Sequence, residues 1–116
     1  MVTVSVLLTI DIPQSHSLKE KRGVVRPLVE RLRTRLHVTA AEAGLQERVD
    51  AAQVGFAAVS GDAATARAIA DDARRFAEDY LIGRGEVLDV ATEETVLRCA
   101  GAPTMRATSN RAVTDS

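Results

Sequence analysis

Residues 2–12 alternate strictly, and this constrains the fold more than any other feature of the sequence. Valine, leucine or isoleucine fills every second position, mostly with threonine, serine or aspartate between, and only Leu7 breaks the pattern. A period of two with β-branched residues predicts a strand that buries one face. Pro13 then ends it. We therefore expect the chain to begin with a half-buried β-strand.

The next segment has the pattern of a capped, amphipathic helix. Ser17 and Glu20 are spaced as a capping box, in which the Ser17 hydroxyl accepts from the Glu20 amide while the Glu20 side chain reaches back. Apolar residues then recur at helical spacing as far as residue 36, and the helix is expected to run to about Arg35. Pro27 lies inside it, which predicts one kinked helix, not two helices.

The rest of the chain completes an alternating order of elements. A weak strand is expected at 37–42, a strand at 53–60, a helix at 63–82 and a strand within 86–97. The order β-α-β-β-α-β predicts an α+β, ferredoxin-like fold, with a four-stranded antiparallel sheet and both helices on one face. This domain spans 1–98, and residues 99–116, which lack any period, are expected to be a disordered tail.

Composition excludes several classes of protein. A chain of 116 residues supports a single domain, and one cysteine with two histidines cannot build a disulfide framework or a Cys/His zinc site. We therefore expect no metal and no cofactor. No apolar run approaches the ~20 residues of a membrane span, and the N-terminus does not resemble a signal peptide. A cytoplasmic globular domain is the expectation.

The net charge of −1 conceals a strong asymmetry. Residues 1–35 carry a net charge of +4 and residues 36–116 a net charge of −5, and within 17–35 seven basic residues face two acidic ones. Such an excess is either an ordinary solvated helix face or a footprint for an anionic polymer, and the imbalance favours the polymer. Phosphate contacts are expected from the helix and its entrance, at Ser15, His16, Lys19, Lys21, Arg22, Arg26 and Arg33.

Two further features limit the chemistry. The chain has only three aromatic residues, all at expected core positions, so it offers no platform on which single-stranded RNA could stack its bases. RNA contacts should therefore involve the helix and loops. His16, His37 and Cys99 form no recognisable nucleophile and base, so we expect a protein that is not an enzyme.

Four segments resemble the YlxP-like family, small bacterial proteins described as a domain of unknown function. They are residues 6–13, 16–22, 27–33 and 54–62, and the His-Ser-Leu-Lys-Glu-Lys-Arg string at 16–22 is the most specific. The resemblance implies a ferredoxin-like fold and a ribosome-associated role similar to that of ribosome-binding factors. Many relatives carry a tryptophan after the second strand, which residues 44–50 of this chain lack.

The sequence thus supports two main hypotheses. The first is a non-enzymatic accessory factor that binds ribosomal RNA or ribosomal particles through the basic helix, in ribosome maturation or translation. The alternative is a protein-interaction or self-association module, with a homodimer formed through an edge strand or the open sheet face. An acylphosphatase shares this topology, but residues 13–17 do not match the glycine-rich substrate loop of that enzyme.

Overall fold

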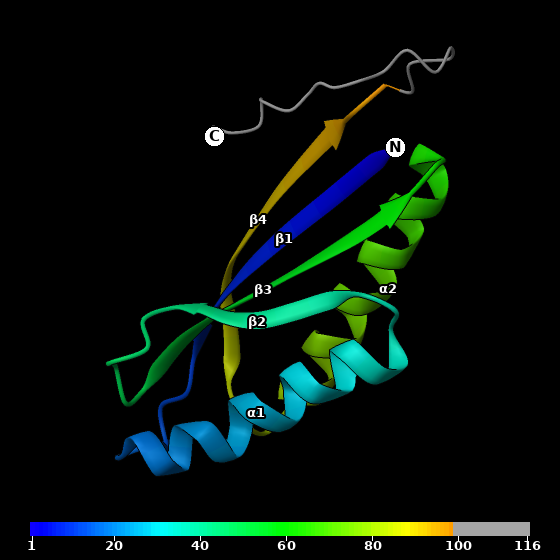
Figure 1. Ribbon diagram of the computed structural model, residues 1–116. Coiled ribbons are helices and arrows are strands. Elements are labelled where there is room, and N and C mark those ends of the chain that lie inside the picture. Colours follow the sequence, from blue (N-terminus) through cyan, green and yellow to red (C-terminus); the bar gives the residue numbers. More distant parts are fainter. Residues whose placement is uncertain (99–116) are drawn as a thin grey trace.

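The computed structural model describes residues 1–98, so the tail predicted at 99–116 lies outside the described residues. Six elements follow one another in the predicted order β-α-β-β-α-β, which confirms the ferredoxin-like α+β fold (Figure 1). They are β1 (Val2–Asp11), α1 (Leu18–Arg35), β2 (Thr39–Gly44), β3 (Ala51–Ser60), α2 (Ala63–Leu81) and β4 (Glu86–Val96).

The four strands form one antiparallel sheet in the order β2-β3-β1-β4. The first strand in sequence is therefore central, and the last one lies at an edge. Backbone hydrogen bonds between Met1 and Leu97, at 2.7 and 2.8 Å, extend the β1–β4 pairing beyond both strand ends. Both helices cover the same face of the sheet, and no described element covers the opposite face (Figure 1).

The core lies between the two helices and the covered face of the sheet. The even-numbered residues of β1 from Val2 to Ile10 are buried, as the alternation predicts. On α2 the buried positions are mainly alanines, at 66, 70, 73 and 77, which let the helix lie close to the sheet. The Tyr80 hydroxyl donates to the Val24 carbonyl oxygen at 2.8 Å and so ties α2 to α1.

Two strand boundaries differ from the sequence prediction. The second strand, expected at 37–42, occupies Thr39–Gly44, because His37 adopts a positive φ of 59° directly after the helix cap at Leu36. The chain turns there and cannot yet pair. The third strand begins at Ala51, two residues earlier than expected, where it pairs with Asp11. The first helix continues through Pro27 as a single element, as predicted.

Asp62 caps the N-terminus of α2. Its Oδ2 accepts hydrogen bonds from the Thr65 amide at 2.9 Å and from the Thr65 hydroxyl at 2.8 Å. The backbone bond from Thr65, followed by the side-chain bond, holds the pKa of the Asp62 carboxyl below its ordinary value of 3.8. A carboxylate whose pKa is lowered by folding stabilises the fold above its unfolded pKa, and this stabilisation is lost as the pH falls through the folded pKa.

We predict that Asp62→Asn flattens the loss of stability in acid. Asparagine keeps the capping acceptor but does not titrate. Below about pH 4 the melting temperature of the variant should therefore fall less than that of the native chain. Thermal melts followed by circular dichroism between pH 7 and pH 2 measure this difference. Asp72→Asn, which changes a carboxylate in the middle of the same helix, is the matched control. Parallel curves for the native chain and Asp62→Asn would contradict the prediction.

Candidate nucleic-acid interface

The entrance of α1 is built by the predicted capping box. Ser17 is the N-cap, and its Oγ accepts from the Glu20 amide at 3.1 Å. Glu20 Oε1 accepts from the amide of His16 at 2.6 Å, one residue before the cap. Both side chains are therefore engaged in holding the helix start, which fixes the direction in which the following turns point their side chains.

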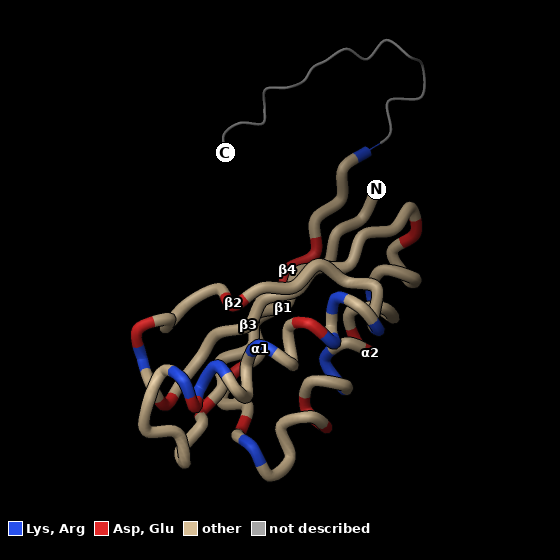
Figure 2. The backbone as a smooth tube through the Cα atoms, turned by 60° about the horizontal axis from the view of Figure 1, so that its bottom comes forward, with Lys and Arg blue, Asp and Glu red and all other residues tan. Residues whose placement is uncertain are grey.

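Four exposed cations follow this cap along one side of α1. We name this set the basic stripe: Lys19, Arg22, Arg26 and Arg33. At 100° and 1.5 Å per residue the four lie within an arc of about 60° over about 21 Å of helix. Figure 2 colours all lysines and arginines blue, those of α1 included. Arg33 Nε donates to the Ala40 carbonyl oxygen of β2 at 2.9 Å, so the C-terminal end of the stripe borders the sheet edge.

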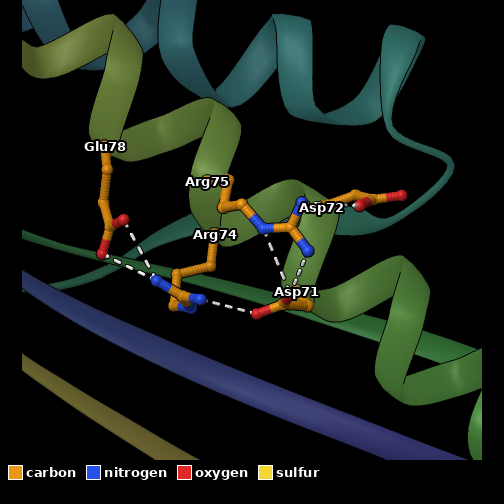
Figure 3. Close-up of polar contacts among 5 residues, drawn as sticks. All are labelled: Asp71, Asp72, Arg74, Arg75 and Glu78. Carbon is orange, nitrogen blue, oxygen red and sulfur yellow. Dashed lines mark hydrogen bonds and ion pairs between the residues drawn. The ribbon is translucent and has the colours of Figure 1, made fainter.

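No carboxylate within residues 1–98 lies within ion-pair distance of any member of the basic stripe. The second helix is the opposite case. Figure 3 shows Arg74 between Asp71 and Glu78, with bonds of 2.6 and 3.0 Å, and Arg75 bound to Asp71. These partners lower the pKa of Asp71 and raise that of Arg74. Arg74 and Arg75 are thus neutralised within α2 and Arg67 by Glu94 of β4, whereas the stripe has no such carboxylate partners within residues 1–98.

The prediction that Lys21 contacts phosphate is wrong, because the residue is buried. It is only 1% exposed, and its ammonium donates to the carbonyl oxygens of Leu45, Gln46 and Ala51 at 2.9, 3.3 and 3.2 Å. Glu42 Oε2 lies 3.1 Å from the same nitrogen but accepts no hydrogen bond. An ammonium can donate three hydrogen bonds, and the three carbonyl oxygens accept them all. Glu42 therefore interacts with Lys21 through its negative charge and not through a hydrogen bond. Lys21 cannot reach a nucleic acid.

The placement of Lys21 follows from helical period. It lies four, seven and eleven residues before Val25, Leu28 and Leu32, which are all buried. That spacing puts position 21 on the apolar side of the helix. The sequence therefore carried a signal that separates Lys21 from its basic neighbours, and a count of charges misses it.

The two residues expected at the helix entrance differ from each other. Ser15 is 6% exposed and its Oγ donates to the Ser17 carbonyl oxygen at 3.1 Å, so it is a structural residue and not a contact. His16 is exposed and lies three residues before Lys19, the first residue of the stripe. The structure thus keeps His16 as a candidate contact and removes Ser15.

The remaining cations of α1 lie on its other side. The Arg31 guanidinium lies 5.3 Å from the centre of the Tyr80 ring, and Arg84 lies 4.4 Å from the same ring. These cation–π contacts orient both arginines toward α2. Arg35 is exposed on the last turn.

Other kinds of site are sparse in the described chain. Within residues 1–98, no three of the metal-binding residue types gather at a distance suited to an ion. An open groove of about 800 Å³ on the uncovered sheet face is lined mainly by alanine, glycine, serine and threonine, with Glu93 as its one charged residue. Phe56 and Tyr80 are buried and Phe76 is half-buried. No helix in this part of the chain has the length and apolar character needed to cross a membrane.

Comparison with known proteins identifies a family but no characterised relative. A family model described as "Protein of unknown function (DUF503)" matches residues 3–92, from the first strand into the last. No curated protein matches the sequence.

Proposed function

We propose that this chain, which belongs to the DUF503 family of proteins of unknown function, is a non-enzymatic accessory factor that binds structured RNA. The RNA is ribosomal, free or within a ribosomal particle, and the setting is the cytoplasm during ribosome maturation or translation. The YlxP-like resemblance and its ribosome-binding-factor association support this finer assignment.

The observation that carries the proposal is the unpaired basic stripe. Its four cations are exposed and have no carboxylate partner within residues 1–98, and Arg33 bonds only a backbone carbonyl, whereas Arg67, Arg74 and Arg75 of α2 all pair with a carboxylate. Cations that neutralise phosphates release condensed counterions, and this release supplies sequence-independent affinity for nucleic acid. A protein that only needed soluble surface would gain nothing from separating paired and unpaired charges onto different helices.

The stripe suits recognition of shape and charge. Its cations line one side of a rigid helix, a form that matches the regularly spaced phosphates of a folded RNA. No aromatic side chain in the described chain is exposed for stacking, which disfavours recognition of unpaired bases. Lys19, Arg22, Arg26 and Arg33 are the proposed phosphate contacts, with His16 at the helix entrance.

Co-sedimentation with purified ribosomal subunits across a salt series tests the proposal. Four phosphate contacts predict a drop in affinity of about 50- to 150-fold between about 50 and 200 mM salt. Affinity capture from lysate, with and without nuclease, is the companion measurement. The proposal expects partners that are lost after nuclease treatment. Partners that survive nuclease, together with no binding to subunits at low salt, would favour the protein-interaction alternative.

A further inference from the structure

The last strand, β4, is an open edge of the sheet. It is 11 residues long, pairs with β1 on one side, and has no described strand on the other. The opposite edge, β2, has only six residues. Each edge strand has one register irregularity, β2 after Glu42 and β4 opposite Thr9 and Ile10, so the two edges differ in length. Short edges resist pairing with other chains, whereas a long edge offers a row of free amides and carbonyls. β4 is therefore the edge on which another strand can be added.

The helices cover little of β4. Along the strand, Leu88, Val90 and Val96 are 59%, 39% and 61% exposed, and Leu97 after it is 63% exposed. Only Val87 packs partly against the core. A strand with large apolar side chains on its surface gains stability when a neighbouring strand covers them.

The charge of β4 is entirely negative. It carries Glu86, Asp89, Glu93 and Glu94 without a lysine or arginine. Within residues 1–98 only Glu94 of these has an ion-pair partner, Arg67, at 2.7 and 2.9 Å. Glu86, Asp89 and Glu93 lie opposite Asp11, Thr9 and Ser5 of β1. These three β1 residues alternate with the buried set, so the unpaired carboxylates of β4 lie on the open face of the sheet.

We propose that β4 binds an extended basic segment of a partner protein, which adds a fifth strand to the sheet. Main-chain hydrogen bonds supply affinity, and alternate lysines or arginines of the segment meet Glu86, Asp89 and Glu93 on the open face. A basic segment fits better than a second copy of this chain, because no register of two β4 strands brings unlike charges together. The inference is independent of RNA binding, since β4 and the basic stripe belong to different elements.

Binding of designed peptides to the full chain tests the proposal. The probe is a fluorescent peptide as long as β4 that alternates lysine with valine and threonine. Three control peptides are compared with it. In the glutamate peptide every lysine is replaced by glutamate, in the grouped peptide all lysines lie at one end, and in the proline peptide prolines remove backbone donors. We expect only the alternating lysine peptide to bind, and hydrogen exchange of β4 amides to slow when it does. Equal binding by the grouped or proline peptide would overturn strand addition.

Charge variants of the protein locate the site. Asp89→Lys with Glu93→Lys should weaken the alternating lysine peptide at least tenfold and allow the glutamate peptide to bind. Asp72→Lys with Asp79→Lys changes the net charge equally on α2 and should alter binding less than twofold. Equal losses in both variants would overturn the site. Slow hydrogen exchange of the β4 amides in the absence of peptide would also overturn the proposal. Protection that grows with protein concentration would indicate a second copy of this chain, and protection lost on deletion of residues 99–116 would indicate that segment.

Discussion

Lys21→Met is expected to destabilise the protein by about 3–5 kcal/mol, the cost of removing one partner from a buried charged network. The substitution leaves the Glu42 carboxylate without its cation and three backbone carbonyls without a donor. In a domain of this size each kcal/mol lowers the melting temperature by about 4–8 °C, so the melting temperature should fall by more than about 12 °C. Urea unfolding and thermal melts measure both quantities.

Lys19→Met is the matched control for this experiment. The same substitution two residues earlier removes an exposed ammonium that has no carboxylate partner among the described residues, and should change stability by about 0.5 kcal/mol or less. Adding Glu42→Gln to Lys21→Met should recover part of the loss, because the orphaned charge is then removed. If Lys19→Met and Lys21→Met destabilised the chain equally, the buried role of Lys21 would be wrong.

Charge reversal at three positions of the basic stripe is the second large effect. Lys19→Glu, Arg22→Glu and Arg26→Glu together should reduce affinity for ribosomal subunits at least 100-fold at low salt, since carboxylates then face the phosphates. The variant with glutamine at all three positions should still bind weakly. Its slope of log K against log salt concentration should be shallower than that of the native chain by about 2–3. Filter binding or co-sedimentation measures both variants.

A triple reversal elsewhere separates the stripe from net charge. Arg67→Glu, Arg75→Glu and Arg84→Glu change the total charge by the same amount but lie outside α1. This control should retain affinity within a few-fold of the native chain, and circular dichroism verifies that both triples are folded. If the two triples lost affinity equally, binding would follow total charge and the stripe would not be the interface.

Local periods predicted the fold because they agree with one another along the chain. The alternation of β1 and the helical spacing of α1 and α2 each assign a buried face, and the β-α-β-β-α-β order then leaves one arrangement. The boundary of β2 was missed because it depends on the backbone of His37, which takes a positive φ. A positive φ is uncommon in any residue other than glycine, so the sequence carried only a weak signal for a turn at His37.

The candidate interface was predicted only in part. A charge count within 17–35 found the cations but treated Lys21 and Arg22 alike, although the first is 1% exposed and the second is exposed. Adjacent helical positions differ by about 100° in direction, which is enough to put one ammonium in the core and one guanidinium in solvent. Ser15 was misassigned because its burial depends on loop geometry that sequence spacing does not describe.

By itself the sequence determined the element order, the capping of both helices and the uneven distribution of charge, because each of these depends on neighbours within a few residues. The tertiary structure alone decided which groups bind the buried Lys21 and which edge of the sheet is open. Lys21 meets carbonyls 24–30 residues away, and β4 is largely exposed since the helices pack mainly over β1, β2 and β3. Contacts between distant segments set burial, and burial decides whether a charged or apolar side chain serves the core or a partner.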